Sequence, residues 1–586
     1  VGSAAGPAQR ASIWPAVERR ILDLVMAHRS TIVFTNSRRL SERLTSRLND
    51  LAAEVIAPAE DEKGTAEVRV PTKSAMGAAE TAQPAARTSF PAAAIGQSGA
   101  TAGADATVAK AHHGSMSKEQ RSLVEEELKA GQLRCVVATS SLELGIDMGA
   151  VDLVIQVEAP PSVASGLQRV GRGGHQVGAV SRGVMFPKYR GDLISCAVLA
   201  ERMAAGAIEE LRYPRNPLDV LAQQIVAMLA MRSYRVTELA QLLRRAAPFT
   251  TLPDSALIAV LDMLSGRYPS EEFGELRPRI TWDRVTDTLT GRPGAQRLAV
   301  TSGGTIPDRG LFSVTTPGAG SGGSRVGELD EEMVYESRVG DKILLGTSSW
   351  QIEDITHDRV IVTPAPGQPA RMPFWKGDTL GRGLELGKAI GAFTREVGAA
   401  DVDAARTRLS DAGLDEWAAD NLLAYLTEQR HATGQLPSDR SVVVERFRDE
   451  LGDWRIVVHS PFGARVNGPW GMLIAARLRQ RRDVQVFASA TDDGIVLRIP
   501  DAVDGSGAEV LPEASDLICE PDEVERLVLA ELGQTALFAA RFRECAARSL
   551  LLPRRNPGRR SPLWQQRHRA AQLLQVASKY DQFPVL

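Results

Sequence analysis

Short runs of apolar, β-branched residues alternate with helical patterns along the first quarter of the chain. The runs are residues 31–35 (TIVFT), 135–139 (CVVAT), 151–157 (VDLVIQV) and 182–186 (RGVMF). Between them, residues 38–53 and 117–131 have the spacing of apolar positions expected of helices. Buried strands separated by helices are typical of a parallel sheet covered by helices. The pattern therefore predicts an α/β lobe over residues 1–206.

This alternation stops between residues 57 and 110. The stretch is rich in Ala, Gly, Pro, Ser and Thr and shows no periodic pattern. Such a composition buries too little apolar surface to offset the entropy lost on ordering. We therefore expect residues 57–110 to be a disordered insertion between two elements of one sheet.

A different pattern follows, with helices first and strands afterwards. Helical spacing over residues 217–231, 236–246 and 254–266 precedes a segment, 276–292, that has two β-rich halves joined by a turn. Three short helices and a hairpin predict a winged-helix module, to which we assign residues 207–304.

The remaining chain, residues 305–586, divides into two parts. Strand-like runs separated by Gly, Asp or Pro predict a β-rich, barrel-like region over 305–381. The runs are MVYES, KILLG, WQIEDI, RVIVTP and ARMPFW, and the Gly/Ser stretch 318–324 predicts a flexible loop. Residues 382–586 mix strands with helices, including helices over 384–428 and near 470–482, and predict a mixed α+β region. The expected fold class is multidomain, α/β followed by α+β.

Composition and charge limit the function without identifying it. Of the 586 residues, 43% are hydrophobic, and 69 Lys and Arg against 72 Asp and Glu give a net charge of −3. A nucleic acid or an acidic membrane would therefore have to bind a local surface. No run of about 18 apolar residues occurs, and the four cysteines include no Cys-x-x-Cys pair. We expect a cytoplasmic protein with no membrane partner.

The densest candidate chemistry lies between residues 112 and 175. Thr139 and Ser140 follow a strand and open a short helix, where hydroxyls and free backbone N–H groups together suit a phosphate. Further along, Arg169 and Arg172 are three residues apart in a helical pattern. They share a helix face and could bind a triphosphate bidentately.

These segments resemble, in order and spacing, the motifs of the second RecA-like lobe of superfamily 2 helicases. TIVFTNSR resembles motif IV, AHHGSMS motif IVa, ATSSLELGID motif V and QRVGRGGH motif VI. Motif VI ends at His175, where many helicases have an arginine; a Gly-His ending is typical of the large helicase-related (Lhr) family. Nearly the whole chain outside 57–110 resembles that family, through RNPLDVLAQQIVAM, TSGGTIPDRGLFSV, GELDEEMVYE, FWKGDTLGRG and HSPFGARVNGPWG.

The Lhr resemblance implies a DNA-dependent ATPase that moves 3′→5′ on single-stranded DNA and unwinds duplexes, RNA:DNA hybrids included, in DNA repair. Its cofactor would be ATP with Mg²⁺. By motif, Gly145 and Asp147 face the nucleotide, while Gln168, Arg169 and Arg172 reach it across the cleft. Arg172 is the better candidate for an arginine finger, which stabilises charge on the transferred phosphoryl group.

The resemblance also assigns residues to the DNA strand. Those expected to hold its phosphates are Thr35, Asn36, Arg38, Gly114, Thr139 and Ser140. Such contacts position a strand without reading its bases, so they do not distinguish DNA from RNA. The winged helix and the family favour DNA.

Two motifs that a complete motor of this class needs do not occur. The sequence has no GxxxxGK[ST] loop and no DExH or DExD box after a strand. These elements cradle the phosphates, hold Mg²⁺ and orient the attacking water. The resemblance therefore implies a segment of a longer protein whose first RecA-like lobe is a missing partner. We expect the chain alone not to hydrolyse ATP.

Four apolar positions are candidates for contacts to bases. Ile280 and Trp282 share one face of the predicted wing strand, either as a wedge at a duplex junction or, equally, as packing between the hairpin and its helices. Trp350 and Trp375 lie at strand ends, where each packs in a core or stacks on a base. The flexible Gly-Thr-Ser-Ser approach favours a surface position, and hence stacking, for Trp350.

Two observations from the rest of the chain leave alternatives open. Residues 541–569 hold nine Arg and one Glu, a basic patch that fits either phosphates or a solvated face. No spacing of His, Cys, Asp or Glu indicates a metal held by this chain. An ATP-independent clamp for single-stranded nucleic acid and an RNA-remodelling helicase remain alternatives to the DNA motor. An upstream segment with GKT and DExH sequences would distinguish the motor from the clamp.

Overall fold

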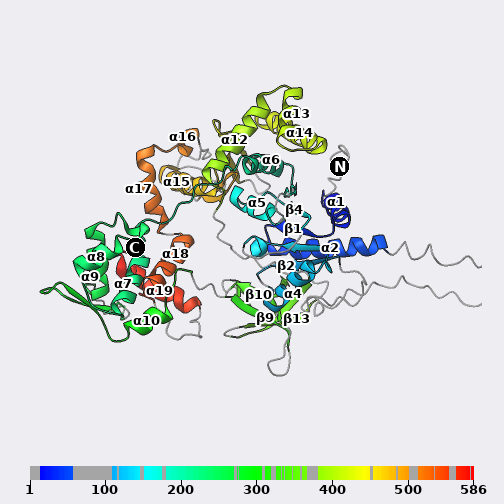
Figure 1. Ribbon diagram of the computed structural model, residues 1–586. Coiled ribbons are helices and arrows are strands. Elements are labelled where there is room, and N and C mark those ends of the chain that lie inside the picture. Colours follow the sequence, from blue (N-terminus) through cyan, green and yellow to red (C-terminus); the bar gives the residue numbers. More distant parts are fainter. Residues whose placement is uncertain are drawn as a thin grey trace, which may run out of the picture. The chain divides into compact units, whose positions relative to one another are not determined.

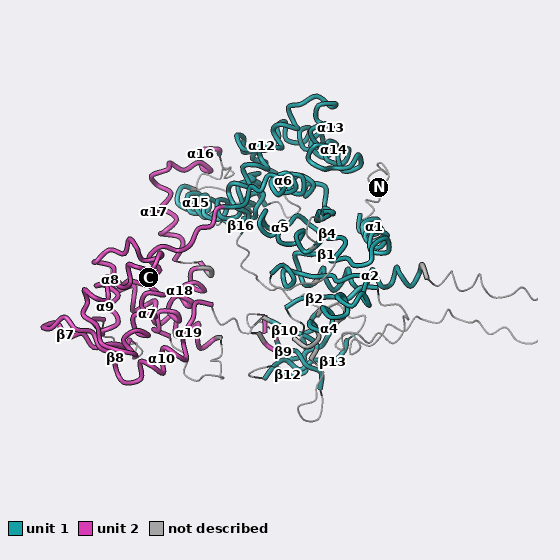
Figure 2. Tube along the Cα trace, viewed as in Figure 1, with its two compact units in different colours: residues 1–209, 313–329, 338–513 teal, residues 210–312, 330–337, 514–586 magenta. Residues whose placement is uncertain are grey.

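The computed structural model forms two compact units, which Figure 2 colours separately. One unit comprises residues 1–209, 313–329 and 338–513, and the other comprises 210–312, 330–337 and 514–586. The structure describes residues 13–56, 108–114, 116, 118–144, 151–174, 180–268, 274, 276–306, 311–317, 325–330, 333–334, 337–345, 348–356, 359–365, 381–448, 453–482, 486–499, 513–533, 535–552, 563–580 and 583–585. Each unit has hydrophobic cores of its own.

A parallel sheet of five strands lies in the first unit, in the order β2-β3-β1-β4-β5. Its strands are β1 (Thr31–Thr35), β2 (Ala109–His112), β3 (Cys135–Ala138), β4 (Leu153–Val157) and β5 (Gly183–Phe186). The helices of this lobe are α1 (Trp14–Ala27), α2 (Arg38–Ile56), α4 (Lys118–Lys129), α5 (Val163–Val170) and α6 (Asp192–Ala204). β1, β3 and β4 are buried along their whole length between two apolar clusters. The expected parallel α/β fold is confirmed.

The edge strand β2 lies where the sequence predicts the end of an insertion. Its sequence, Ala-Lys-Ala-His, has no β-branched residue, so propensity does not indicate a strand. Pairing of Ala109 with Cys135 on β3 determines its conformation. The Asn49 amide on α2 donates to the Ala109 carbonyl (2.9 Å) and accepts from the N–H groups of Val108 and Ala109 (3.0 and 2.9 Å). The predicted insertion therefore extends too far at this end, and its residues 57–107 lie outside the described residues.

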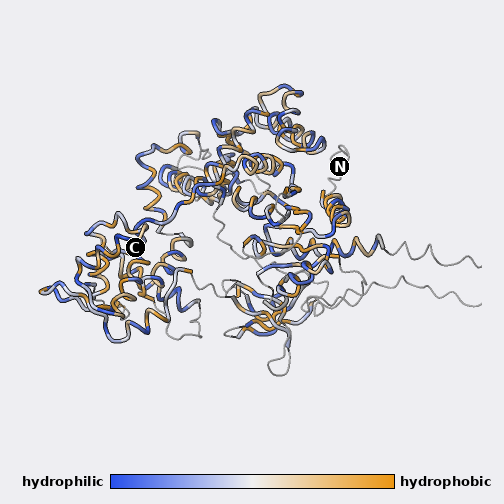
Figure 3. Tube along the Cα trace, in the orientation of Figure 1, coloured by the Kyte–Doolittle hydropathy of each residue, from blue (hydrophilic) through white to orange (hydrophobic). Residues whose placement is uncertain are grey.

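The second unit contains the winged helix that the sequence predicts. Its elements are α7 (Leu218–Leu229), β6 (Tyr234–Arg235), α8 (Val236–Leu243), α9 (Asp254–Ser265), β7 (Ile280–Asp283), β8 (Thr288–Gly291) and α10 (Ala295–Thr301). β6 joins the β7–β8 hairpin in a three-stranded antiparallel sheet. At two residues, β6 is too short to produce a periodic pattern. Hydrophobic and hydrophilic residues alternate along the helices (Figure 3), as amphipathic helices require.

Helices from the end of the chain also belong to this second unit, and the last two of them contribute to its core. They are α16 (Ala514–Leu517), α17 (Pro521–Leu532), α18 (Ala536–Arg548) and α19 (Leu563–Ala577). Phe542 and Leu573 are buried in the same apolar cluster as α7, α8 and α9. Nε of Arg548 donates to the Asp219 carboxylate on α7 at 2.6 Å. The sequence pattern assigns residues 207–304 to a module of their own and does not predict that the last helices of the chain pack against it.

A curled sheet in the order β10-β9-β13-β12-β11 forms the expected β-rich region (Figure 1). Its strands are β9 (Leu311–Thr315), β10 (Arg325–Asp330), β11 (Lys342–Leu345), β12 (Ser348–Ile355) and β13 (Arg359–Pro364). One expected strand is wrong, because Met333 and Val334 of the MVYES run are helical and buried. A short apolar run does not distinguish a strand from a buried helical turn. ARMPFW and the Gly/Ser stretch 318–324 lie outside the described residues.

Three helices and an antiparallel sheet form the expected α+β region. α12 (Leu384–Ala399), α13 (Val402–Asp411) and α14 (Glu416–Thr433) share an apolar cluster with α6. The sheet has the order β14 (Val443–Arg448), β15 (Trp454–His459), β17 (Gly494–Ile499) and β16 (Phe487–Thr491), and α15 (Ala464–Arg482) packs on it. α15 begins before the expected residue 470 even though it contains Pro469. Among the described helices, none has the length and hydrophobicity needed to cross a bilayer.

Candidate functional site

The helicase-like motifs gather at one edge of the parallel sheet. Asn36 follows the end of β1, Gly114 follows β2, and Thr139 follows β3. All five strands are parallel, so their carboxyl ends share an edge. Crevices at the carboxyl ends of parallel strands are where α/β sheets bind their ligands. The fold therefore brings together motif residues that are more than a hundred positions apart.

Arg169 of α5 is a buried hub within this edge, with 3% of its surface exposed. Its Nε donates to the Glu143 carboxylate at 3.0 Å, and its Nη1 donates to the side-chain oxygens of Asn36 (2.8 Å) and Gln156 (3.0 Å). The guanidinium lies 5.5 Å from the ring centroid of Phe34. Burial lowers the pKa of Arg169, and the Glu143 carboxylate opposes that shift. Arg169 thus joins motifs IV, V and VI through side chains.

Glu143 and Gln156 are partners that the sequence analysis missed. Glu143 lies in the motif V segment, one turn after Ser140, and Gln156 is the one polar residue in the buried strand β4. A polar side chain in an otherwise apolar buried strand usually has a hydrogen-bond partner. That signal identifies Gln156 as a residue of interest, although it does not identify Arg169 as its partner.

Arg172 lies three residues after Arg169 and is partly exposed. Its Nη2 donates to the backbone carbonyl of Glu143 at 2.9 Å. Both motif VI arginines therefore contact the same motif V residue, one through the carboxylate and the other through the main chain. Gln168, directly before Arg169 in the helix, is exposed. Gly145, Asp147 and His175 lie outside the described residues.

The residues expected to hold strand phosphates differ in accessibility. Ser140 and Gly114 are exposed, and Thr139 is half-buried just before the 3₁₀ turn Ser140–Leu142. Asn36 is exposed at the sheet edge, and its Nδ2 donates to the Ala159 carbonyl at 2.8 Å. Thr35 is completely buried, and its hydroxyl donates to the carbonyls of Ser37 (3.1 Å) and Ala138 (3.4 Å), so its side chain is used within the fold.

Arg38 begins α2 close to Gly114. A Cβ atom on Gly114 would lie 3.5 Å from Nη2 of Arg38, so motifs IV and IVa meet here. Burial lowers the pKa of Arg38, and the charge of Glu328 on β10 opposes the shift. The β-rich sheet thus contributes an acidic side chain to the surroundings of a motif IV residue.

The histidine pair of motif IVa connects the strand β2 to the motif V turn. His112 is 1% exposed; its Nδ1 lies 2.8 Å from the Ser141 hydroxyl and its Nε2 lies 2.9 Å from the Glu125 carboxylate. Burial lowers the pKa of His112, with Glu125 opposing the shift. His113 contacts Glu42 of α2 at 2.6 Å. The His112–Ser141 contact holds the turn that carries Ser140, while Glu125 and Glu42 tie the two histidines to helices α4 and α2.

Two of the four apolar candidates for base contacts, Ile280 and Trp350, are buried, and Trp282 is half-buried. Ile280 is 1% exposed in the winged-helix core, which favours the packing alternative over the wedge. Trp350 is 0% exposed and lies between Ile343 and Pro364 of the neighbouring strands. The expectation of a surface aromatic at Trp350 is therefore wrong, and stacking on a base would require the side chains that cover it to move. Trp375 lies outside the described residues.

The basic segment 541–569 is partly used within the fold. Arg548 pairs with Asp219, and Nη1 of Arg541 lies 3.0 Å from the Glu544 carboxylate. Residues 553–562, which include four of its arginines, lie outside the described residues. Among the described residues, no group of three or more His, Cys, Asp or Glu side chains is arranged to hold a metal.

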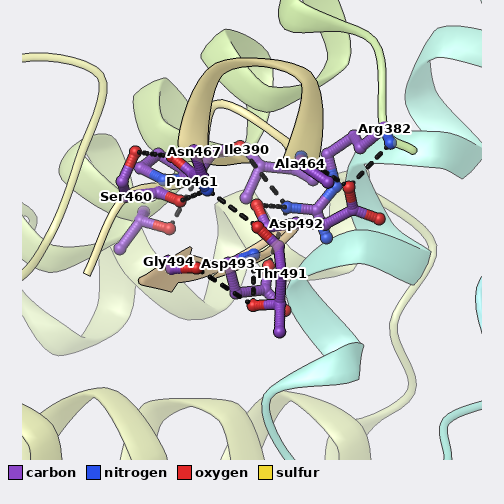
Figure 4. Close-up of polar contacts among 11 residues, drawn as sticks. Arg382, Ile390, Ser460, Pro461, Ala464, Asn467, Thr491, Asp492, Asp493 and Gly494 are labelled. Atoms are coloured by element: carbon purple, nitrogen blue, oxygen red, sulfur yellow. Dashed lines mark hydrogen bonds and ion pairs between the residues drawn. The ribbon is translucent and has the colours of Figure 1, made fainter. Parts of the chain in front are cut away.

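A second polar cluster joins the start of α12 to the antiparallel sheet (Figure 4). One carboxylate oxygen of Asp492 accepts from the backbone N–H groups of Arg382 and Ala464, both at 2.8 Å. The buried Asn467 amide donates to the carbonyls of Ser460 (3.1 Å) and Thr491 (2.9 Å). These contacts give the HSPFGARVNGPWG and LGRG segments a structural role, because they fix a turn, a helix start and a strand end at one junction.

Three protein families and a solved structure are similar to parts or all of this chain. A helicase conserved C-terminal domain matches residues 101–176, the winged helix domain of large helicase-related proteins matches 201–372, and a DEAD/H associated domain matches 436–586. The structure is similar to that of Mycobacterium smegmatis helicase Lhr bound to ssDNA and AMP-PNP, with a TM-score of 0.72 and 52% identity over 99% of this chain and 63% of that one.

Three curated relatives extend well beyond this chain. Lhr helicase/probable uracil glycosylase of Mycolicibacterium smegmatis is 59% identical over 98% of this chain and 37% of its own length. Lhr helicase/uracil glycosylase of Escherichia coli is 53% identical over 98% and 36%. ATP-dependent helicase Lhr-Core of Saccharolobus solfataricus is 30% identical over 97% and 60%. The chain thus spans little more than a third of the two bacterial relatives.

Proposed function

We propose that this chain, which belongs to the large helicase-related (Lhr) family of superfamily 2 helicases, is part of an ATP-dependent helicase. In this proposal, ATP hydrolysis drives movement on single-stranded DNA in the 3′→5′ direction. The same movement unwinds duplexes, RNA:DNA hybrids included, in cytoplasmic DNA repair. The winged helix and the β-rich sheet would act on the strands that the motor separates.

The observation that carries the proposal is the link between Arg172 and the motif V turn. Arg172 is partly exposed and contacts the Glu143 carbonyl, while Ser140 in the same turn is exposed at the sheet edge. A nucleotide phosphate on one side and a strand phosphate on the other would therefore meet one short segment, Ser140–Glu143. A displacement caused by hydrolysis would reach the strand directly.

ATP and Mg²⁺ fit only part of their site here. Arg172 would supply the charge that stabilises the transferred phosphoryl group, and Arg169 would hold the turn in place through Glu143. The proposal assigns the phosphate cradle and the Mg²⁺ ligands to a first RecA-like lobe. ATP hydrolysis would supply the free energy for movement.

Measurement of ATP hydrolysis tests the proposal. We expect this chain alone to be inactive with or without single-stranded DNA, and a chain extended upstream to include GKT and DExH sequences to be stimulated by DNA. In the extended chain, Arg172→Ala should reduce hydrolysis by about 10³-fold or more while DNA binding persists. Arg182→Ala, at an exposed position beside β5, is the control and should retain activity.

Two outcomes would contradict the motor. Robust hydrolysis by the present chain would show that no second lobe is required. If the extended chain stays inactive while both chains bind single-stranded DNA tightly, the protein is an ATP-independent clamp. A strand-displacement assay with 3′ and 5′ tails then tests the direction of movement in any active chain.

A further inference from the structure

A pocket on the winged helix is separate from the sheet edge described above. It lies between the end of α9 and the β7–β8 hairpin, which projects from its unit (Figure 2), and it has a volume of about 380 Å³. Gly266, Arg267, Ile280, Trp282, Arg284 and Arg292 line it. Ser265 and Thr281 complete the lining, so three of its eight residues are arginines and none of the eight is acidic.

A buried carboxylate orients two of the arginines. Asp262 of α9 is 3% exposed and forms ion pairs with both Arg267 and Arg284, one through each carboxylate oxygen. The side chains of Arg267 and Arg284 remain 67% and 54% exposed. Against the three arginines stand two carboxylates, Asp262 and the Asp287 side chain that contacts Trp282, so positive charge remains in excess by one. An anion is therefore the ligand that this pocket attracts.

Both the ring face and the N–H group of Trp282 in the pocket have contacts within the protein. The guanidinium carbon of Arg284 lies 3.3 Å from the centroid of its ring, and its Nε1 donates to the Asp287 carboxylate at 3.1 Å. Stacking of bases on aromatic rings is the usual means of holding single strands, and Arg284 covers this ring face. The pocket therefore offers its guanidinium groups, which bind phosphates well, rather than an open aromatic face.

The arginines also stand on a rigid support. The end of α9 and the hairpin approach closely at Gly266, where φ is +92° and an added Cβ atom would lie 2.7 Å from Pro278. Ile280 fixes the hairpin in the core with 1% of its surface exposed. The backbone positions that carry the three arginines are therefore fixed relative to one another, and Asp262 further restrains the side chains of Arg267 and Arg284.

We propose that this arginine pocket binds the sugar–phosphate backbone of a nucleic-acid duplex. The proposal rests on the proposed function and deepens it, because it assigns the duplex to a surface distinct from the sheet edge that grips the single strand. A duplex presents phosphates at a fixed spacing, which matches fixed guanidinium groups, whereas a flexible single strand gains little from them. The contact carries no base sequence information.

Binding of two DNA probes tests the pocket in the chain as it exists. One probe is a blunt duplex and the other is a single strand, each followed by fluorescence anisotropy over a series of salt concentrations. The variant is Arg267→Gln with Arg292→Gln, which leaves Asp262 paired with Arg284. We expect duplex affinity to fall at least about tenfold, and the slope of log affinity against log salt to decrease by about 1 to 2. Single-strand affinity should stay within about twofold of the wild-type value.

A matched variant controls for charge alone. Arg245→Gln with Arg297→Gln removes two exposed arginines of the same unit outside the pocket and should leave both affinities nearly unchanged. Thermal unfolding of both double variants checks that the fold is retained. Equal loss from the two variants would overturn the proposal, because net charge would then explain the effect.

The remaining outcomes separate this pocket from the motor. Unchanged duplex binding in the pocket variant, or an equal loss on single strands, overturns the pocket while leaving the proposed function intact. Failure of the wild type to bind single strands counts against the proposed function, and the duplex probe still tests the pocket. Competition by AMP or inorganic phosphate at about millimolar concentration, abolished in the pocket variant, would identify a free-anion site and overturn duplex binding.

Discussion

Arg169 and Arg172 come from the same helix end, but their surroundings differ. Arg169 is enclosed by Glu143, Gln156 and Asn36, whereas Arg172 is partly exposed and contacts the Glu143 carbonyl. A buried guanidinium that satisfies a carboxylate and two amides stabilises the three segments it joins. A partly exposed one is accessible to a ligand. At this scale we infer that Arg169 positions the site and Arg172 acts in it.

Replacing Arg169 with alanine should destabilise the lobe strongly. The change leaves the Glu143 carboxylate and the buried Gln156 side-chain oxygen without their Arg169 partner, and breaking such a buried ion pair typically costs about 3–5 kcal/mol. Urea unfolding followed by circular dichroism measures the loss. Gln168→Ala, at the exposed neighbouring position, should change stability by less than about 0.5 kcal/mol. Similar effects of both changes would contradict the role of Arg169 as a buried hub.

Burial of His112 predicts a loss of stability in mild acid. The pKa of His112 in the folded protein lies below its ordinary value, because burial disfavours the charged ring more than Glu125 favours it. The unfolded chain takes up a proton at the ordinary pKa of about 6.5, before the folded protein does. This contribution to stability is therefore complete above about pH 6.5 and is lost as the pH falls toward the folded-state pKa.

Urea unfolding at about pH 7.5 and about pH 5.5 measures this acid effect. His112→Gln keeps a polar side chain that does not titrate. We expect the variant to be less stable than the wild type at the higher pH, because the Ser141 and Glu125 contacts are weakened, but to lose less stability on acidification. An equal acid loss in both proteins would rule out His112 as its source.

At the scale of the element, α15 begins where two backbones touch. Gly463, just before α15, has φ +91°, and an added Cβ atom would overlap the carbonyl oxygen of Arg382. This approach allows one Asp492 carboxylate oxygen to accept from both Arg382 and Ala464. The start of α15 therefore depends on a residue without a side chain and on an acceptor contributed by the β16–β17 turn.

Replacing Gly463 with alanine should destabilise the junction by more than about 3 kcal/mol, since backbone strain and steric overlap add. Gly434, at the end of α14, is the matched control. It has φ +75° but open space around it, so Gly434→Ala should cost only about 1–2 kcal/mol. Chemical unfolding of the two variants measures the difference. Equal costs would show that the close approach to Arg382 contributes nothing.

At the scale of the whole molecule, the winged helix is completed by the last helices of the chain. Phe542 and Leu573 are buried against α7 and α9, and Arg548 pairs with Asp219. Without α18 and α19, this apolar surface of the winged helix would face water. Burial of apolar surface is the main favourable term in folding, so the module that carries the arginine pocket depends on residues far away in sequence.

Truncation after residue 513 should therefore destabilise the winged helix. We expect residues 210–312 to become sensitive to limited proteolysis and the truncated chain to aggregate, whereas the full chain resists both. Leu573→Ala, which removes a fully buried side chain, should cost about 2–5 kcal/mol without truncation. A truncated chain with protease resistance equal to that of the full chain would show that the module folds by itself.

Local patterns were sufficient for most elements and insufficient for a few. The strands 31–35 and 359–364 have the bounds that the sequence predicts, because a β-branched run between turn residues has few alternative conformations. β2 and the start of α15 instead depend on hydrogen bonds from Asn49 and Asp492. Such partners come from distant parts of the chain, so neither propensity nor period indicates them.

The sequence by itself determined the order of the motifs, the family and the fold class of each region. Those properties depend on residue types at fixed local spacing, which the chain carries before it folds. Only the tertiary structure decided which side chains are accessible: Arg169, Ile280 and Trp350 are buried, while Arg267 and Arg284 are exposed around Asp262. Burial results from contacts between segments that are distant in sequence, and local periodicity does not encode those contacts.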